Sequence, residues 1–259
     1  MLPVEREQYI IEKLDELGTV KVEDIANELD VSLMTIRRDF DRLQDKGILY
    51  RSHGGAVKRS TYLSEQSYDL KKISNIYVKE KIAEKALSII KEGDSIFLDA
   101  GTTTFELAKV LNKVKDITVI TNDLKIALEL YQNNVKAYIV GGKIQEETGC
   151  IIGPTADEFI SNIKVNVAFL GTSGIDSDFR LSTPTFEKAN LKKRIVKSAS
   201  YSVLLTDSSK FNKESFVNIF SIESVNCIIT DKKFDKDEDK YLESLNVKII
   251  NVINRNFIQ

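Results

Sequence analysis

The residues best suited to binding a ligand lie in one segment, Asp99-Ala-Gly-Thr-Thr-Thr104. An apolar run over 96–98 precedes it and apolar residues at helical spacing follow over 105–111, so the sequence predicts a buried strand, a turn and a helix. The first N–H groups of a helix are unpaired and carry a partial positive charge, which stabilises an anion such as a phosphate. A simpler alternative is that one threonine only caps the helix. The predicted anion contacts are the backbone at Gly101 and the hydroxyls of Thr102, Thr103 and Thr104.

A second candidate site lies in the first sixty residues, where three helices and a hairpin are predicted. Apolar residues repeat at helical spacing over 10–17, 25–29 and 33–43. Two short extended arms over 48–57 then surround Gly54-Gly55, a pattern typical of a β-hairpin. Three helices followed by such a hairpin indicate a winged helix-turn-helix.

Charge divides sharply within this region. Residues 1–30 hold 3 basic and 9 acidic side chains, net −6, whereas residues 32–59 hold 7 basic and 3 acidic, net +4. The affinity of a protein for DNA comes mostly from basic groups that neutralise phosphates, so a local positive patch matters more than the net charge of −2 on the whole chain. The third helix and the hairpin are therefore predicted to face DNA. The alternative is an ordinary solvated helix face. Ser32, also the predicted N-cap, Thr35 and Arg38 are placed to reach base edges, and Arg37 a base or a phosphate.

The same region resembles the DNA-binding head of DeoR-type transcriptional regulators. The resemblance rests on Val31-Ser-Leu-Met-Thr-Ile-Arg-Arg-Asp-Phe40, on Leu43-x-x-x-Gly47-Ile-Leu, and on Arg51-Ser-His-Gly-Gly-Ala56. The Thr-Ile-Arg-Arg-Asp core is a specific signature. The resemblance implies that Thr35, Arg37 and Arg38 read operator DNA and that Arg51 and His53 contact its backbone.

Beyond residue 78, apolar and helical segments alternate, which predicts an α/β domain with a largely parallel sheet. Ligands of such sheets bind beyond the carboxyl ends of the strands. The polar segments expected at those ends are Asp99–Thr104, Thr121-Asn122, Gly141-Gly142-Lys143, Gly171–Asp176 and Asp207–Lys210.

These segments, with Lys188-Ala-Asn-Leu-Lys192, resemble the effector-sensing domain of the DeoR family, so that the resemblance covers nearly the whole chain. That domain is similar in fold to ribose-5-phosphate isomerase, and its ligands are typically phosphorylated sugars or sugar metabolites. Lys188 departs from the family, which usually has a glutamate there, although Glu187 is adjacent. The resemblance implies that Gly101 to Thr104 hold the phosphate, that Asp99, Thr121 and Asn122 bond hydroxyls or brace the loop, and that Asp176, Lys192 and Lys210 close the pocket.

Length and composition set the domain organisation. At 259 residues two domains are expected: a winged helix-turn-helix over 1–58, a linker over 59–77 and an α/β effector domain over 78–259. Neither a secretory signal nor a membrane-length apolar stretch is found, so we expect a cytoplasmic protein without membrane contact. Cys150 and Cys227 are expected to be reduced core residues, and one histidine leaves little for a metal site; no cofactor is expected.

The resemblance implies a repressor of a sugar-metabolism operon that is controlled by a phosphorylated sugar, and because two DNA-binding heads are needed for adequate affinity, we expect a homodimer or homotetramer. The alternative is an isomerase-like enzyme with Glu187 as base, although Gly171-Thr-Ser-Gly174 replaces the acidic turn of the related isomerases. A nucleotide-binding switch is disfavoured, because the chain has neither a Walker lysine motif nor a Gly-x-Gly-x-x-Gly turn.

Overall fold

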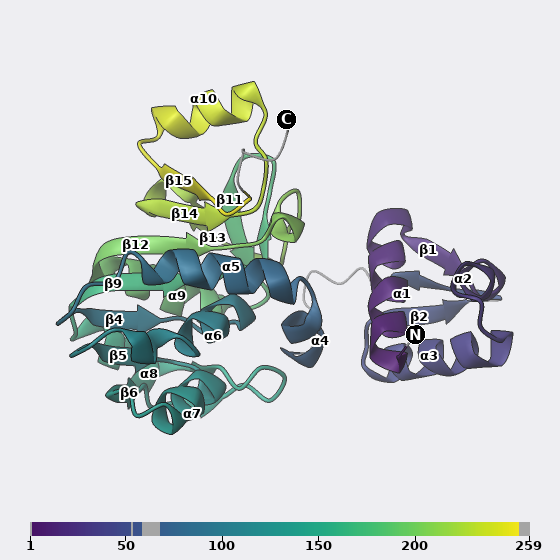
Figure 1. The fold of residues 1–259 in the computed structure, drawn as a ribbon, viewed down its shortest axis with the longest axis horizontal. Coiled ribbons are helices and arrows are strands. Elements are labelled where there is room, and N and C mark those ends of the chain that lie inside the picture. Colours follow the sequence, from purple (N-terminus) through teal and green to yellow (C-terminus); the bar gives the residue numbers. More distant parts are fainter. Residues whose placement is uncertain (1, 53, 59–67, 254–259) are drawn as a thin grey trace. The chain divides into compact units, whose positions relative to one another are not determined.

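A computed structural model describes residues 2–52, 54–58 and 68–253. The chain forms two compact units, Met1–Ser74 and Asn75–Gln259, which are described separately (Figure 1). Within the described residues, no helix combines the length and apolar composition that crossing a bilayer requires.

The first unit is a three-helix bundle closed by a small antiparallel sheet. Its core is formed by apolar residues of all three helices, among them Ile10, Ile36 and Phe40, which are fully buried. The predicted helices and hairpin are confirmed. The elements are α1 (Pro3–Leu17), β1 (Thr19–Lys21), α2 (Val22–Leu29), α3 (Leu33–Asp45), β2 (Leu49–Ser52), β3 (Gly55–Lys58) and α4 (Tyr68–Ile73).

Strand β1 was not predicted from the sequence, because only Val20 of its three residues is buried and so no alternation is visible. It completes the sheet in the order β1-β3-β2, with Val20 opposite Ala56. The close approach explains Gly55: a Cβ there would lie 2.3 Å from the Val20 carbonyl oxygen. Gly54 takes the positive φ of 80° that the hairpin turn needs.

The second unit is built on seven parallel strands in the order β15-β14-β12-β9-β4-β5-β6, which confirms the α/β prediction (Figure 1). Its strands are β4 (Ser95–Leu98), β5 (Thr118–Thr121), β6 (Ala137–Ile139), β9 (Val165–Leu170), β12 (Ala199–Leu205), β14 (Cys227–Thr230) and β15 (Lys248–Asn251). Its helices are α5 (Ile76–Leu87), α6 (Thr102–Ala108), α7 (Leu124–Gln132), α8 (Pro154–Ser161), α9 (Phe186–Ser198) and α10 (Lys236–Ser244).

Helices cover both faces of this sheet because side chains along a strand alternate between them. Ile96 and Leu98 of β4 pack with α5, α6 and α7, whereas Phe97 packs with α8 and α9. Both faces of the central strands are therefore buried, as is usual for parallel sheets.

Two further groups of strands were not anticipated from the sequence. β10 (Gly174–Ile175), β11 (Arg180–Thr183) and β13 (Val217–Ser221) form an antiparallel sheet, and β7 (Lys143–Ile144) pairs with β8 (Ile151–Ile152). These strands are too short to show an apolar period. Three single 3₁₀ turns, Leu111–Lys113, Ser208–Lys210 and Ile222–Ser224, complete the elements. Within the segment predicted as linker, residues 68–73 form α4.

Candidate functional site

Helix α3 presents two arginines to solvent in the first unit. The Arg37 and Arg38 side chains are exposed, and neither guanidinium forms an ion pair with a residue that the structure describes. At the start of the helix, Ser32 Oγ accepts a hydrogen bond from Thr35 N at 3.1 Å and lies 2.9 Å from Thr35 Oγ1. Ser32 is thus the N-cap, as predicted, and the two hydroxyls contact each other.

The inner side of α3 is held by a buried ionic network. Asp39 is fully buried and accepts hydrogen bonds from the guanidinium groups of Arg6 and Arg42. Glu7, also buried, pairs with Arg42 at 3.1 Å and with Lys46 at 2.7 Å. The hydrogen bond to Asp39 raises the pKa of Arg6. The last residue of the Thr-Ile-Arg-Arg-Asp signature therefore orients the exposed arginines by fixing α3 against α1.

The hairpin arginine has an intramolecular role. Arg51 NH1 pairs with Asp41 and lies 3.5 Å from the carbonyl oxygen of Arg37, while Arg51 N donates to Gln44 Oε1 at 2.9 Å. These contacts tie the wing to α3 and use one side-chain nitrogen of Arg51, NH1, so the expected backbone contact with DNA would fall to its other N–H groups. His53, the other predicted wing contact, lies outside the described residues.

In the second unit, the strands that follow β4 in the chain are added to the sheet first on one side and then on the other. Strands β5 and β6 lie on one side of β4, whereas β9, β12, β14 and β15 lie on its other side, so the strand order reverses direction between β4 and β9. Such a reversal is the usual ligand position in open α/β sheets. Asp99 follows β4 there and is 2% exposed. Its Oδ2 accepts from Gly171 N at 3.1 Å and pairs with Lys192 Nζ, which also donates to Gly171 O at 2.8 Å. Asp99 thus has a loop N–H as partner, with Lys192 neutralising its charge.

Two further predicted ligands brace the loops. Thr121 and Asn122 are fully buried. Thr121 Oγ1 donates to Leu98 O at 2.8 Å, and Asn122 Oδ1 accepts from Ala100 N at 3.0 Å. Of the two roles left open from sequence, hydroxyl binding or bracing, the structure shows bracing.

The threonines of the turn differ from one another. Thr104 is fully buried and its Oγ1 lies 2.7 Å from Asp99 O and 2.9 Å from Gly101 O, so its hydroxyl donates within the loop. The Thr104 hydroxyl is thus engaged with the backbone of its own loop, and its contact with an anion stays a prediction. Gly101 has extended backbone, and a Cβ there would lie 3.2 Å from Thr104 Oγ1. Thr102 and Thr103 stand in the first turn of α6.

A second buried lysine lies one turn before Lys192 on α9. Lys188 is 8% exposed and Lys192 6%. Burial raises the pKa of the Cys150 thiol to about 12, and the positive charge of Lys188 opposes this shift. Because Lys192 is paired with Asp99, Lys188 is the lysine of this pair whose positive charge would favour an anion nearby in this region of low dielectric.

An unpartnered hydroxyl lies at the end of β11, just before α9. Thr183 Oγ1 is buried and has no hydrogen-bond partner among the described residues. Its neighbour Ser182 accepts, through its carbonyl oxygen, from Thr172 Oγ1 and Ser173 N, both at 3.1 Å, in the loop that follows β9. Buried hydroxyls are usually paired, so this one is available to a ligand or water.

The remaining predicted residues are engaged elsewhere. Asp176 Oδ1 accepts from Asp178 N and Arg180 N, at 2.9 and 2.8 Å, and so closes the β10–β11 turn. Lys210 lies after β12, two strands from β4, beside the buried Asp207. Burial would raise the pKa of Asp207, but the Lys210 charge and hydrogen bonds from Ser209 and Asn75 lower it. Asp176 thus stabilises a turn and Lys210 stabilises the charge of Asp207, and their closing of the effector pocket stays a prediction.

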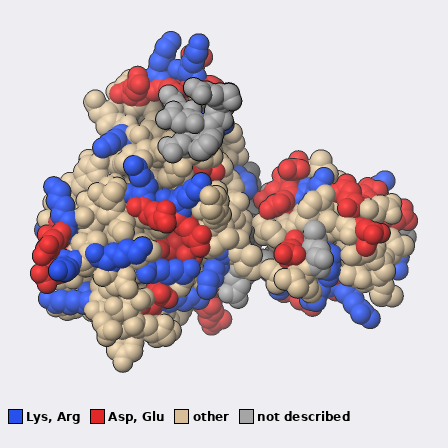
Figure 2. All heavy atoms as spheres, viewed as in Figure 1, with Lys and Arg blue, Asp and Glu red and all other residues tan. Residues whose placement is uncertain are grey.

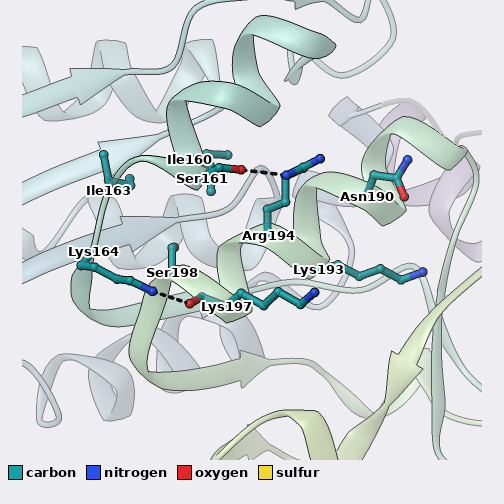
Figure 3. Close-up of a pocket in the computed structure, with 9 residues that line it drawn as sticks. All are labelled: Ile160, Ser161, Ile163, Lys164, Asn190, Lys193, Arg194, Lys197 and Ser198. Carbon is teal, nitrogen blue, oxygen red and sulfur yellow. Dashed lines mark hydrogen bonds between the residues drawn. The ribbon is translucent and has the colours of Figure 1, made fainter.

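A separate hollow of about 440 Å³ lies between α8 and α9 (Figure 3). Arg194 NH1 donates to Ser161 Oγ at 2.7 Å, and Lys164 Nζ donates to Lys197 O at 3.0 Å. Cations at helix C-terminal ends are favoured by the helix dipole, which accounts for this basic lining. Helix α9 contributes the exposed residues Asn190, Lys193, Arg194 and Lys197 to this hollow, whereas Lys188 and Lys192 are buried and do not line it.

Sequence reasoning missed three of these features. In the sequence, Asp39 stands out only as part of a motif and Lys188 only as a departure from a family, and no pattern marks Thr183. A buried charge or an unpaired hydroxyl depends on which segments pack around it, and residue spacing carries no signal of that kind.

Comparisons with known proteins agree with this geometry. The DeoR-like helix-turn-helix domain matches residues 6–61, and the DeoR C-terminal sensor domain matches residues 74–232. The HTH-type transcriptional regulator GlpR of Haloferax volcanii is 36% identical over 98% of this chain and 100% of its own length. The glycerol-3-phosphate regulon repressor of Escherichia coli is 32% identical over 89% of this chain and 92% of its own.

Among solved structures, ribose 5-phosphate isomerase A of Methanocaldococcus jannaschii matches with a TM-score of 0.40 and 20% identity, over 53% of this chain and 55% of that one. The relatives along the whole chain are named transcriptional regulators and not enzymes. The resemblance noted in the sequence is confirmed: this chain belongs to the DeoR-like family of helix-turn-helix transcriptional regulators.

Proposed function

We propose that this protein is a cytoplasmic repressor of a sugar-metabolism operon. Its first unit binds operator DNA, and a phosphorylated sugar bound to the second unit releases it. The name of the Escherichia coli relative, a glycerol-3-phosphate regulon repressor, supports both the repressor sign and a small phosphorylated effector. Two heads on adjacent half-sites are needed for adequate affinity, so the active species is a homodimer or homotetramer.

The DNA-binding half of the proposal rests on Arg37 and Arg38, which are exposed on α3 while Asp39 beside them is anchored in the core. An arginine that bonds a guanine edge contributes about 1–3 kcal/mol of discrimination. Arg38→Ala is therefore expected to weaken specific binding about 5- to 150-fold. Arg51 contributes to the phosphate contacts through N–H groups other than those of NH1, which pairs with Asp41.

The test is a mobility-shift titration on duplexes selected from a random-sequence pool with the wild-type protein. Arg180→Ala, an exposed arginine of the second unit, is the matched control and should bind as the wild type does. Unchanged specific affinity in Arg38→Ala would remove Arg38 from the DNA interface.

The effector half of the proposal rests on one observation. The second unit buries two lysines of α9 and the unpartnered hydroxyl of Thr183 on the segments that follow β9, beside the point where the strand order reverses. We assign the phosphate to the amides and hydroxyls of Thr102 and Thr103, with the charge of Lys188 supporting it. A sugar hydroxyl completes the hydrogen bonding of Thr183.

The test is a thermal-shift screen of sugar phosphates against their unphosphorylated parents. A phosphate ester present at a free concentration 100 times its Kd should stabilise the folded protein by about 2.7 kcal/mol. Lys188→Met should abolish this shift, whereas Lys193→Met, an exposed lysine on the same helix, should retain it.

Thr183→Val separates binding from stability. Because Thr183 Oγ1 has no partner among the described residues, its replacement by an isosteric methyl should leave the ligand-free melting temperature unchanged or higher. The effector shift should nevertheless fall. If both Lys188→Met and Thr183→Val respond to the effector as the wild type does, the site lies elsewhere.

A further inference from the structure

Four cations line the hollow between α8 and α9, and two of them have no partner in the described part of the chain. Lys193 and Lys197 form neither an ion pair nor a hydrogen bond through their ammonium groups with any residue that the structure describes. Arg194, in contrast, pairs with Asp157 at 3.5 Å, and Lys164 Nζ donates to the Lys197 carbonyl oxygen. Lys193 and Lys197 are thus the two cations that remain available to a ligand.

The two available lysines lie on one exposed face of α9. Asn190, Lys193 and Lys197 are all exposed, and their spacing of three and four residues places them in one row along the helix. Lys193 and Lys197 point in the same direction, whereas Arg194 points toward α8 (Figure 3). Like charges four residues apart repel each other and destabilise a helix slightly. Contacts among the described residues therefore do not explain why the two lysines stand together.

The positive charge of the hollow is only partly offset. Among the residues that the structure describes, no acidic side chain lines it. Asp157 offsets one of the four charges through Arg194, and the C-terminal ends of α8 and α9 contribute about half a negative charge each. About two positive charges therefore remain. The face of the second unit seen in Figure 2 differs, because basic and acidic side chains are interspersed over it.

The α9 basic face, defined as Lys193, Arg194 and Lys197, suits the phosphate groups of a nucleic acid backbone. Lysine binds phosphate as a point charge, so it needs no fixed geometry. Lys193 and Lys197 are about 6 Å apart along the helix axis, less than the Debye length of about 10 Å at ~0.1 M salt, so they act on an anion together. The hollow beside them, of about 440 Å³, leaves room for a phosphate group between α8 and α9.

We infer that the α9 basic face binds the phosphate backbone of duplex DNA without reading its sequence. Duplex DNA is the polyanion that helix-turn-helix regulators bind, and a contact with its backbone needs only positive charge. Once the first unit is bound, the second unit of the same chain is held near the same duplex, so that even a weak contact gains from a high effective concentration. The inference rests on the DNA-binding half of the proposed function and adds a second surface to it.

The test measures DNA affinity by fluorescence anisotropy between about 50 and 200 mM salt, on a selected operator duplex and on an unrelated duplex. The double variant Lys193→Gln/Lys197→Gln should weaken binding to both duplexes by the same factor, about 10-fold. The slope of log affinity against log salt concentration should fall by about 1 for each lysine in each bound chain.

The matched control is Lys236→Gln/Lys240→Gln. It removes two exposed lysines that are also four residues apart, on α10, where three acidic residues lie between them. Because those acids already offset the charge of the two lysines, this variant should bind both duplexes as the wild type does. Circular dichroism melting of the α9 double variant should match the wild type, since neither lysine has a partner among the described residues.

The outcomes separate this inference from the proposed function. A folded α9 double variant with the wild-type salt slope would overturn the inference, while the effect of Arg38→Ala on specific affinity would still test the first unit alone. A lower slope in the α9 variant together with unchanged affinity in Arg38→Ala would support the α9 contact and remove Arg38 from the interface.

Two further results would also overturn the α9 contact with DNA. One is an equal fall of the slope in the α10 control, because any lost positive charge would then suffice. The other is a melting shift by inorganic phosphate that the wild type shows and the α9 variant lacks, while the salt slopes of the two proteins agree. The face would then bind a free anion and not DNA.

Discussion

The contact between Asp99 and Lys192 joins the loop after β4 to α9, and its removal tests the geometry of the second unit. Both groups are buried, at 2% and 7% side-chain exposure. Lys192→Met leaves the carboxylate buried with only the Gly171 N–H as partner, and loss of one partner of a buried pair costs about 3–5 kcal/mol. Asp99→Asn is expected to cost a similar amount, because the ammonium loses its counterion.

The double variant removes both charges and should be less destabilised than the sum of the single variants. We expect a coupling energy of about 2–3 kcal/mol, within the range for directly contacting groups. Urea unfolding of the full chain followed by circular dichroism measures this. With a slope of about 2 kcal/mol/M, a loss of about 4 kcal/mol moves the midpoint of the second unit by roughly 2 M.

The control for this cycle is Lys193→Met, the exposed neighbour on α9, which should change stability by less than about 0.5 kcal/mol. Additive single variants, or a Lys192→Met variant that loses less than ~1 kcal/mol, would refute the reasoning. In either case the two charges would be solvated and not engaged with each other.

Three further predictions concern other buried groups. Asp39→Ala leaves Arg6 buried without its carboxylate, so the first unit should lose about 3–5 kcal/mol in urea unfolding, while exposed Asp45→Asn should lose little. Folding lowers the pKa of Asp207, so the ionised carboxylate stabilises the folded protein fully above about pH 3.9, the ordinary pKa of an aspartate. This stabilisation is lost as the pH falls through the lower pKa that Asp207 has in the folded protein. Asp207→Asn should therefore reduce the loss of stability on the acid side of a stability-against-pH curve. Cys150, with a pKa of about 12, should resist iodoacetamide at pH 8 until urea unfolds the second unit, and rapid alkylation of native protein would contradict its burial.

The sequence predicted the local elements well because their signals are local. Ser32 caps α3 as expected, and the strand, turn and helix around Gly101 are present. The strand β1 and the sheet of β10, β11 and β13 escaped prediction, because their residues are ordered by partners distant in the chain.

The candidate sites divide in the same way. The charge pattern of α3 was readable because exposed arginines need no tertiary partner, and Arg37 and Arg38 are exposed as predicted. Thr104 and Asp176 were expected to face a ligand, and Asn122 either to bond a ligand hydroxyl or to brace the loop, and polar atoms of all three bond the protein's own backbone. A polar side chain in a loop has several possible partners, and its spacing does not choose among them.

By itself, the sequence determined the two-part organisation, the winged helix-turn-helix, the parallel α/β character of the larger unit and the family resemblance, because periodicity, turn residues and short motifs are properties of the chain alone. Only the tertiary structure decided that Asp99 pairs with Lys192 and that, among the described residues, the side chains of Thr183, Lys193 and Lys197 lack a polar partner. Hydrogen bonds and desolvation depend on distances of a few ångströms between residues far apart in the chain, and those distances exist only after the sheet and its helices have packed.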